Sequence, residues 1–329
     1  MAQHSIKRQS HSVMRRIAAI VLLFAVLAAI IFCMTLCRCS PMGEWDACLE
    51  IAHDTQTDGS TITVRGADEV VSMSEQMKTA EIAVRNIVTP YGENVAVAVM
   101  PLDGTSSGFS INGDKAFTAA SMIKLLVLAE YMREVDASDL DPAGVYVLQT
   151  SDIVGGSGVV QEQSPGTPYA YAELARCMIK YSDNTATNIL IDTMGKDSIN
   201  LRSDDLGLSN TELRRRMMRV NEGEENYISA NDAATLLCEI ARHTLASEEI
   251  CAIAESYLLE QSDPEGLAQG LPANVLFGHK TGSLSSVRHD GGIVYGESPY
   301  VVVVLTSLDE GTANALMSNI SRAAYAALC

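Results

Sequence analysis

The order of secondary structure along the chain constrains its fold more than any other feature. Alternating, β-branched stretches typical of strands lie near residue 100 and again close to the C-terminus, and the segment between them has helical periodicity. The predicted strands are 95–101, 108–112, 275–280, 291–295 and 300–307, and the predicted helices are 72–88, 119–135, 171–180, 183–194, 229–243, 247–260 and 312–328. This order predicts an α+β fold, an α/β sandwich in which both ends of the chain build one sheet and an all-α lobe is inserted between them.

The segment from Ile17 to Cys37 is the feature that predicts a membrane anchor. Its 21 residues carry no charge and span about 30 Å as a helix, which is the thickness of a bilayer's hydrocarbon core. More basic residues precede it than follow it, so the N-terminus is expected in the cytoplasm. A cleaved signal peptide is the alternative, although such apolar stretches are usually shorter. We expect a cytoplasmic tail (1–16), a single transmembrane helix (17–37), a linker (38–71) and an extracytoplasmic domain (72–329).

Charge excludes one class of partner. The chain has 23 basic and 41 acidic residues, and its first 43 residues hold five of the basic ones and no acid. The remainder therefore carries 18 basic and 41 acidic residues, a charge of −23. Nucleic-acid binding requires basic surface to replace counterions, so no nucleic-acid partner is expected, and we expect a monomer.

The cysteines suggest disulfides rather than a metal site. An extracytoplasmic domain permits disulfides, and Cys238 and Cys251 lie on consecutive predicted helices, where they could meet. Spacing alone does not set the connectivity. No Cys-x-x-Cys pair or His/Cys cluster has zinc-site spacing, so neither a metal nor another cofactor is expected.

Three short motifs occur once each and in a fixed order. They are Ser121-Met122-Ile123-Lys124 at the start of a predicted helix, Ser182-Asp183-Asn184 at a helix junction and Lys280-Thr281-Gly282 at the end of a predicted strand. A single Ser-x-x-Lys match should arise by chance about once in a chain this long. The ordered combination is far rarer, and it is the signature of serine enzymes that react with penicillin.

The residue types fit nucleophilic attack on an acyl carbonyl. Ser121 and Lys124 share a helix face, so Lys124 can take the proton of Ser121 if burial or a nearby cation favours its neutral form. Lys280 is the natural second cation. Ser182 can pass a proton from Lys124 to the leaving amine, and Asn184 can orient Lys124 and the acyl side chain.

The strand that carries the third motif supplies the expected substrate contacts. Lys280, Thr281, Gly282 and Ser283 would bind substrate at the strand edge, where Gly282 permits close backbone approach. The N–H groups of Ser121 and Ser283 would form the oxyanion hole. Arg288 is either a further contact to a substrate carboxylate or a surface arginine.

Other residues near the motifs are expected to be structural. We assign Asp183 to capping the helix and bracing the loop. His279 precedes Lys280 and His289 follows Arg288, but the sequence supplies no partner that would make either one a triad member. We expect both to be structural histidines whose ring nitrogens are hydrogen-bonded.

With these motifs, the stretch from about Ser74 to the C-terminus resembles a class A β-lactamase. Further matches are the Gly156-Ser157-Gly158-Val159 loop and Thr-x-Leu at 211–213. The resemblance implies an antiparallel five-stranded sheet with the terminal helices packed on it, beside a helical lobe, and an active site between the two. It also implies an acyl-enzyme mechanism on β-lactams or on related D-Ala-peptide amides.

The sequence departs from that family at the residue that should activate water. Class A β-lactamases carry a glutamate in the loop between the second and third motifs, and counting from Thr211 places this position at Met217. A thioether cannot take a proton from water. Glu222, followed by Asn226 at the family's Glu-x-x-x-Asn spacing, is the alternative base. With Met217 in place, we expect acylation to survive and deacylation to be slow.

Two kinds of alternative function stay open. One is a D,D-peptidase or penicillin-binding protein that acts on peptidoglycan stem peptides. The other is a non-catalytic module, either a sensor that a β-lactam acylates once or a structural wall-binding protein.

Overall fold

Five antiparallel strands form the central sheet of the computed structural model, which describes residues 72–104 and 106–329. In spatial order they are β2 (Phe109–Ile111), β1 (Val95–Pro101), β9 (Tyr300–Thr306), β8 (Val287–Val294) and β7 (Phe277–Leu284). The first strand pairs with the last, with Val97 opposite Val304. The predicted five-stranded antiparallel sheet, built from both ends of the chain, is confirmed.

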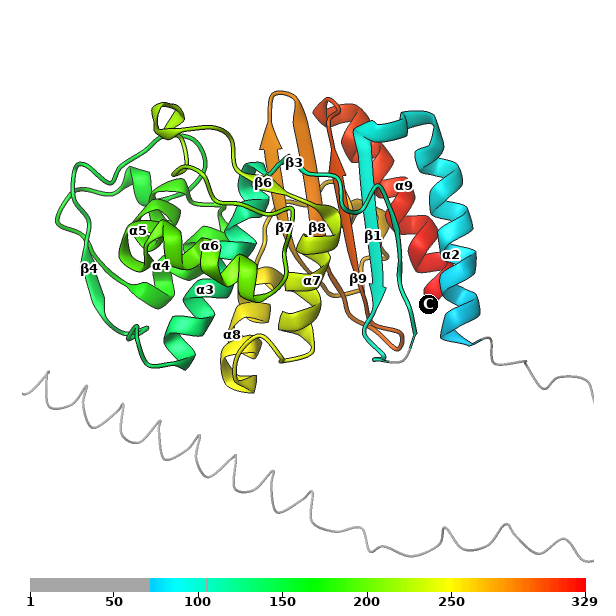
Figure 1. Cartoon of the computed structure of the whole chain (residues 1–329), viewed down its shortest axis with the longest axis horizontal. Helices are drawn as coiled ribbons and strands as arrows, with labels where there is room; N and C mark the ends of the chain where they lie inside the picture. Colours follow the sequence, from blue (N-terminus) through cyan, green and yellow to red (C-terminus); the bar gives the residue numbers. More distant parts are fainter. Residues whose placement is uncertain (1–71, 105) are drawn as a thin grey trace, which may run out of the picture. The chain divides into compact units, whose positions relative to one another are not determined.

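The terminal helices α2 (Met73–Val88) and α9 (Glu310–Leu328) cover one face of this sheet (Figure 1). Alternate residues of β1 and β9, including Val97 and Val304, point into the core shared with these helices, whereas Ala98 and Val303 point into the other core. Both faces of the sheet are therefore buried, which explains why β9 is almost continuously apolar.

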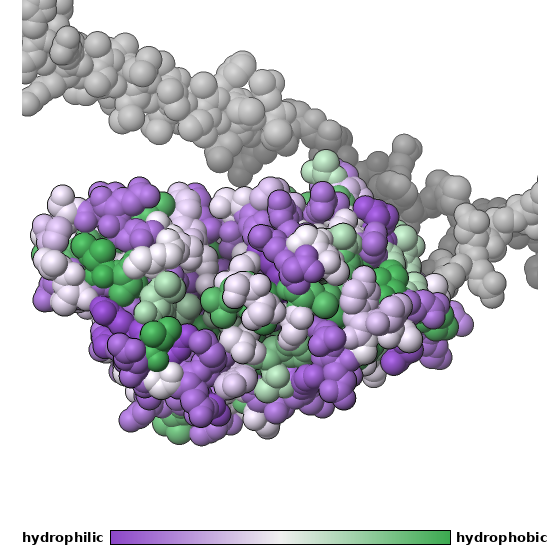
Figure 2. Space-filling view, turned by 90° about the horizontal axis from the view of Figure 1, so that it is seen from above, coloured by the Kyte–Doolittle hydropathy of each residue, from purple (hydrophilic) through white to green (hydrophobic). Residues whose placement is uncertain are grey.

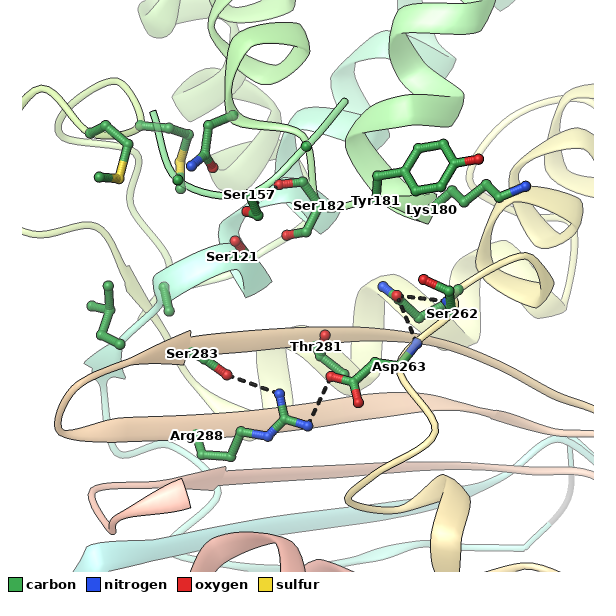
Figure 3. Close-up of a pocket in the computed structure, with 18 of the residues that line it drawn as sticks. Ser121, Ser157, Lys180, Tyr181, Ser182, Ser262, Asp263, Thr281, Ser283 and Arg288 are labelled. Carbon is green, nitrogen blue, oxygen red and sulfur yellow. Dashed lines mark hydrogen bonds and ion pairs between the residues drawn. The ribbon is translucent and has the colours of Figure 1, made fainter. Parts of the chain in front are cut away.

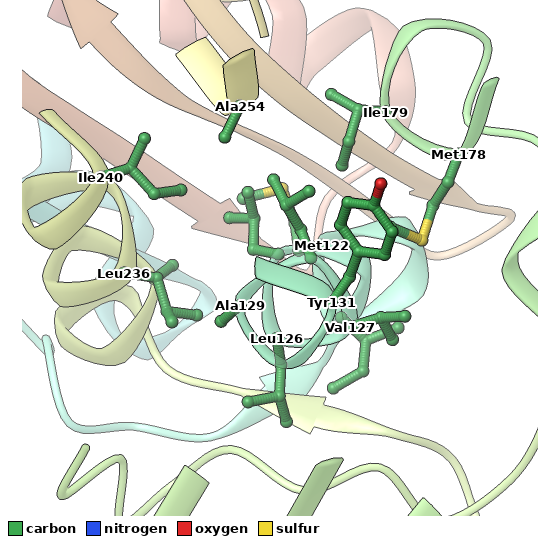
Figure 4. Close-up of a cluster of buried hydrophobic side chains, with 14 of the residues drawn as sticks. Met122, Leu126, Val127, Ala129, Tyr131, Met178, Ile179, Leu236, Ile240 and Ala254 are labelled. Atoms are coloured by element: carbon green, nitrogen blue, oxygen red, sulfur yellow. The ribbon is translucent and has the colours of Figure 1, made fainter. Parts of the chain in front are cut away.

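The helical lobe lies against the opposite face. Its helices are α3 (Lys124–Asp136), α4 (Tyr171–Lys180), α5 (Asn184–Met194), α6 (Lys196–Asp205), α7 (Ala230–Ala241) and α8 (Glu248–Leu259). Helix α3 runs through its centre: Figure 4 shows Leu236 and Ile240 of α7 on one side of it and Met178 and Ile179 of α4 on the other. Two short antiparallel pairs complete the lobe. One joins β3 (Phe117–Thr118) to β6 (Tyr227–Ile228), and the other joins β4 (Val145–Val147) to β5 (Pro168–Ala170).

Two details differ from the sequence prediction. Helix α6 was not predicted because it is polar, with only Ile199 and Ser203 buried. Strand β7 continues to Leu284 and β8 begins at Val287, so the Lys280-Thr281-Gly282 motif lies within a strand and not at its end. These extensions of β7 and β8 were not predicted, because the positions that point into the protein hold buried polar residues and leave no hydrophobic pattern.

The cysteine prediction was wrong. Cys238 and Cys251 are both buried and both free, and neither forms a disulfide. Each fills space in the core of the helical lobe as a small apolar side chain would.

The predicted anchor (17–37) and linker (38–71) lie outside the described residues. Within 72–104 and 106–329, no helix combines the length and apolar character that crossing a membrane requires. The face of this domain seen in Figure 2 is largely polar, and polar side chains interrupt its apolar ones.

Candidate active site

The three motifs meet at a cleft of about 580 Å³ between the helical lobe and β7. Ser121 lies in a 3₁₀ turn, η2 (Ala120–Ile123), that leads into α3, and Ser182 lies in the turn between α4 and α5. Figure 3 shows Ser121, Ser157 and Ser182 on one side of the cleft and Thr281, Ser283 and Arg288 on the other. We call this space the Ser121 cleft; besides these six it is lined by Ala120, Gly156, Gly158, Val159, Lys180, Tyr181, Asn184, Met217, Met218, Gln261, Ser262, Asp263, Leu284 and Glu310.

Lys124 is the centre of the hydrogen-bond network behind the cleft. Its side chain is fully buried, and Nζ lies 3.0 Å from Ser121 Oγ and 3.1 Å from Ser182 Oγ. The same nitrogen contacts two carbonyl-type acceptors, the backbone oxygen of Ser182 at 2.6 Å and Oδ1 of Asn184 at 2.9 Å. The predicted proximity of Ser121, Lys124, Ser182 and Asn184 is therefore present in the structure.

A neutral amine can satisfy three of these four contacts, those to the carbonyl of Ser182, to Asn184 Oδ1 and to the hydroxyl of Ser121. A neutral lysine has two N–H donors and one lone pair, whereas a protonated lysine has three donors and no acceptor. The carbonyl of Ser182 and the amide oxygen of Asn184 can only accept, so they take both donors of the neutral form. The lone pair is then available to accept the hydroxyl proton of Ser121.

Burial favours the same protonation state. The pKa of Lys124 is held well below its ordinary value, chiefly because the side chain is removed from water and also because Lys280 is a nearby cation, while Asp183 opposes the shift. Lys124 is therefore suited to act as a base.

Lys280 connects the sheet to the helical lobe. It is fully buried, and its Nζ donates to Ser182 Oγ at 3.0 Å and to the carbonyl of Thr281 at 2.7 Å. Removal from water lowers the pKa of Lys280 to about 7, with Arg288 acting in the same direction and the carboxylates of Asp290 and Asp263 acting against it. Ser182 Oγ thus lies between two lysines.

An unusual backbone conformation places Ser182 between them. Its φ is +52°, in the left-handed region that residues other than glycine rarely adopt. This conformation directs both the hydroxyl and the carbonyl oxygen of Ser182 at Lys124. Such strain costs of order 1 kcal/mol and tends to be kept at functional sites.

Gly282 brings β7 against the turn that carries Ser121. A Cβ at Gly282 would lie only 3.1 Å from the backbone nitrogens of Ser121 and Met122. A larger residue here would force β7 or the turn that carries Ser121 to move by a few tenths of an ångström. The N–H groups of Ser121 and Ser283 therefore belong to two segments held in close approach, as an oxyanion hole requires.

Asp183 has the structural role that the sequence predicted. Its carboxylate accepts from the N–H of Ala186, which caps α5, and from those of Val159 and Val160 in the facing loop. Gly158 permits this contact, because a Cβ there would lie 2.3 Å from Asp183 Cγ. Asp183 thus fixes the loop that forms one wall of the cleft.

The two histidines are buried and hydrogen-bonded. His279 Nδ1 lies 2.8 Å from Asp290 Oδ1, and His289 contacts the carbonyl of Thr118 and the N–H of Thr306. Burial lowers the pKa of His289 to about 4. The prediction that both are structural is confirmed.

Arg288 is not a surface residue, and sequence reasoning missed its partners. The side chain is 4% exposed, and it donates to Ser283 Oγ, to Asn314 Oδ1 and to Asp263 Oδ2, each at 2.9 Å. Asp263 and Asn314 belong to a loop and to α9, and neither forms part of a recognisable motif. Only the fold brings them to Arg288.

Met217 lies at the wall of the cleft, and Glu222 does not. The side-chain amide of Asn188 holds Met217 through two bonds, accepting from its N–H at 2.7 Å and donating to its carbonyl at 3.0 Å. Glu222 is exposed and pairs with Arg216, which lowers the pKa of Glu222. It faces a separate hollow with Arg216 and Asp192. Glu222 is therefore absent from the described lining of the Ser121 cleft.

No arrangement of side chains for a metal is present in the part of the chain that the structure describes, where no three His, Cys, Asp or Glu residues converge suitably.

Comparisons with known proteins agree with this geometry. The family model described as "Beta-lactamase enzyme family" matches residues 79–328. A beta-lactamase of Streptomyces fradiae is 26% identical over 62% of this chain and 71% of its own length. The crystal structure of a beta-lactamase from Sphaerobacter thermophilus is 30% identical, with a TM-score of 0.69 over 75% of this chain and 95% of that one. PBP-A, solved as an acyl-enzyme complex of a leucine-to-glutamate variant with penicillin G, is 26% identical, with a TM-score of 0.70 over 76% of this chain and 96% of that one. The chain belongs to the beta-lactamase enzyme family and is a serine hydrolase of the β-lactamase and penicillin-binding type.

Proposed function

We propose that the protein acylates Ser121 with β-lactams or with D-Ala-peptide-like amides and releases the acyl group slowly. One observation carries this proposal: a continuous hydrogen-bonded chain runs from Ser121 Oγ through Lys124 Nζ and Ser182 Oγ to Lys280 Nζ. A chain of this kind can remove a proton from the nucleophile and deliver one to a leaving group.

The acylation step can be written with its protons balanced. Lys124 takes the proton of Ser121 as Oγ attacks the carbonyl, and the N–H groups of Ser121 and Ser283 stabilise the oxyanion. The ammonium of Lys124 then has a third N–H, which is free to donate to Ser182 Oγ, 3.1 Å away. Ser182 passes its own hydroxyl proton to the leaving amine and takes one from Lys124, so Lys124 returns to its neutral form.

Substrate binding falls to the residues around this chain. We assign Asn184, Lys280, Thr281, Gly282, Ser283 and Arg288 to it; of these, Asn184, Thr281, Ser283 and Arg288 line the Ser121 cleft. Lys280 lies just behind the wall, in contact with Ser182.

Slow release is proposed because of Met217. Deacylation needs a base that activates water beside the acyl-enzyme, and the side chains that this loop presents to the cleft are the thioethers of Met217 and Met218. The likeness to PBP-A, whose leucine-to-glutamate variant was captured as an acyl-enzyme with penicillin G, supports acylation of Ser121 by a β-lactam. The loss of one general base typically slows a step 10²- to 10⁴-fold.

We further propose that the domain is a monomer held outside the cytoplasm by the apolar segment at 17–37. The support for this localisation is the uncharged run of 21 residues and the basic residues that precede it.

Labelling with a fluorescent penicillin, followed by a chase, tests the proposal. Label that appears and then decays over minutes to hours is the expected result. Label that decays within seconds indicates an efficient β-lactamase, which is the second candidate because the curated relative from Streptomyces fradiae is named as one. Permanent label indicates a sensor, and the absence of label refutes acylation. A D,D-peptidase would also release D-alanine from a stem-peptide analogue.

A further inference from the structure

A second hollow adjoins the Ser121 cleft along strand β7. It has a volume of about 290 Å³, and Gln261, Ser262 and Asp263 line both spaces, so this short segment is their common wall. Figure 3 shows Ser262 and Asp263 on the far side of Thr281 from Ser283. We call this space the His279 hollow. Its other lining residues include Leu271, Ala273, Val275, Phe277 and His279.

One face of β7 passes from the cleft into this hollow. The side chains of a strand alternate between its two faces, so the odd-numbered residues from 277 to 283 share one face. Of these, Thr281 and Ser283 line the Ser121 cleft, and Phe277 and His279 line the His279 hollow. Residues two apart in a strand lie about 7 Å apart. The hollow therefore begins about 7 Å beyond Thr281, in the direction away from Ser283 and the oxyanion hole.

The ring of His279 supplies the hollow with a hydrogen-bond acceptor. His279 is 3% exposed, and its Nδ1 lies 2.8 Å from Oδ1 of Asp290, whose other oxygen accepts from the N–H of Leu267. A carboxylate can only accept, so in the neutral imidazole Nδ1 carries the proton and Nε2 carries the lone pair. Nε2 has no hydrogen-bond partner among residues 72–104 and 106–329. A ligand in the hollow can therefore donate to it.

The other lining residues of the hollow, apart from the wall that it shares with the cleft, are apolar. The ring of Phe277 stacks on that of His279 with the centroids 4.5 Å apart. Leu271 and Val275 are half-buried against the core beneath α2 and α9, whereas Ala273 is exposed. An apolar surface with one acceptor suits a chain of methylene groups that ends in an N–H donor.

We propose that the His279 hollow binds the side chain of the leaving residue, so that the enzyme prefers leaving D-amino acids whose long side chain ends in an N–H donor over D-alanine. This inference rests on the proposed acylation of Ser121 and names the substrate class more closely. The amine of the leaving residue is bonded to the carbonyl that Ser121 attacks, and its carboxylate is expected at Lys280 and Arg288.

The lengths agree with this assignment. A carboxylate held beside Thr281 places the side chain of the same residue next to the shared wall. The methyl group of D-alanine cannot cross the roughly 7 Å from there to His279. Four methylene groups and a nitrogen span about 6 Å, which brings a terminal N–H within hydrogen-bond reach of Nε2 while the methylene groups contact Phe277 and Val275.

Three peptides test the inference, namely N-acyl-D-alanyl-D-alanine, N-acyl-D-alanyl-D-norleucine and N-acyl-D-alanyl-Nε-acetyl-D-lysine. They share the acyl group and the leaving carboxylate, and their leaving side chains are a methyl group, a four-carbon chain and a four-carbon chain with an amide N–H. The rate constant for acylation of Ser121 is measured at pH 8 by mass spectrometry of the amino acid released in the first turnover. Each rate constant is divided by that of the D-alanine peptide.

We expect the norleucine peptide to acylate Ser121 about tenfold faster than the D-alanine peptide, because its chain becomes buried. The Nε-acetyl-lysine peptide should be about fivefold faster again, because it adds the hydrogen bond. Ala273→Trp places an indole in the hollow and should bring both ratios close to one. Asn274→Trp adds the same ring at the neighbouring exposed position, which does not line the hollow, and should keep the wild-type ratios.

Equal rate constants for the three peptides in the wild type, or ratios that persist in Ala273→Trp, overturn the inference. It is also overturned if none of the peptides acylates a protein that a fluorescent penicillin still labels at Ser121, and the proposed acylation by β-lactams then stands. If the penicillin also leaves Ser121 unmodified, the proposed function fails and the inference fails with it.

Discussion

Lys280 and Ser182 lie 98 residues apart in the chain, and Nζ of one donates to Oγ of the other across 3.0 Å. The bond joins β7 to the turn between α4 and α5, so it links the sheet to the helical lobe. Ser182 Oγ also lies 3.1 Å from Lys124. When both lysines donate to it, the two lone pairs of Ser182 are occupied and its own proton is free to leave toward the cleft.

The first prediction concerns the nucleophile. Ser121→Ala should abolish labelling by a fluorescent penicillin, because Ser182, the other cleft hydroxyl in contact with Lys124, also accepts from Lys280 and serves the proton transfer. Ser262→Ala is the matched control: this serine also lines the cleft, but its hydroxyl has no bond to either lysine among the described contacts, so labelling should persist within about twofold of wild type. Labelled Ser121→Ala protein, mapped to another residue by peptide mass spectrometry, would refute the assignment.

The second prediction concerns the base. Lys124→Arg keeps a positive charge of similar reach but cannot give up its proton in a protein, so the acylation rate constant should fall 10²- to 10⁴-fold. Lys180 also lies at the cleft wall, and an arginine there can keep the pairing with Glu260. The Lys180→Arg variant should therefore be acylated at close to the wild-type rate. Acylation of Lys124→Arg at close to the wild-type rate would mean that a cation is needed and a base is not, whereas equal losses in the two variants would attribute the loss to the larger arginine side chain. The circular dichroism spectrum of each variant would distinguish misfolding from the loss of acylation activity.

The fold was predictable because its signals are local and repetitive. The alternation along β1 and β9, with Val97 and Val304 on one face and Ala98 and Val303 on the other, could be read directly as strands. Helix α7 begins at the predicted position, where Ser229 accepts from the N–H of Asp232 and caps the helix. Helix α6 was missed because most of its residues face water and leave no apolar period.

The candidate site was predictable only as far as its motifs extend. Ser121, Ser182 and Lys280 belong to short motifs, and the order and spacing of these motifs predict a serine-enzyme site. Asp263 and Asn314 do not, because each meets Arg288 only through tertiary packing of a loop and a helix on the sheet. The extension of β7 past Lys280 was hidden for a similar reason, since a buried lysine resembles a strand end in any hydrophobic pattern.

The third prediction follows from the burial of Lys280. Its folded pKa, about 7, is below the value of about 10.4 in an unfolded chain. Between these two values the unfolded state binds more protons than the folded state, so the free energy of unfolding rises with pH, by up to about 1.4 kcal/mol per pH unit from this group. Lys280→Met removes this contribution.

Urea unfolding at pH 7.5 and 9.5 measures it. The stability of the wild type relative to Lys280→Met should increase by about 2 kcal/mol over this interval. Lys78→Met, at an exposed position on α2, is the control and should follow the wild-type pH profile. A constant difference between wild type and Lys280→Met would show that Lys280 stays protonated in the folded protein.

The fourth prediction tests the role of Met217 in release. Met217→Glu places a carboxylate at the cleft wall on a backbone that Asn188 fixes through two hydrogen bonds, so the new side chain should reach the water next to the Ser121 ester. The deacylation rate constant, followed by loss of the acyl mass after the free penicillin is removed, should rise 10²- to 10⁴-fold with acylation little changed. Met218→Glu adds the same charge one residue further on, where the side chain is 52% exposed and the backbone φ is +62°. This second variant lacks the support of Asn188, so its release rate should stay near wild type. Equal acceleration in both variants would attribute the effect to added negative charge, and no acceleration in Met217→Glu would place the deacylating water elsewhere in the cleft.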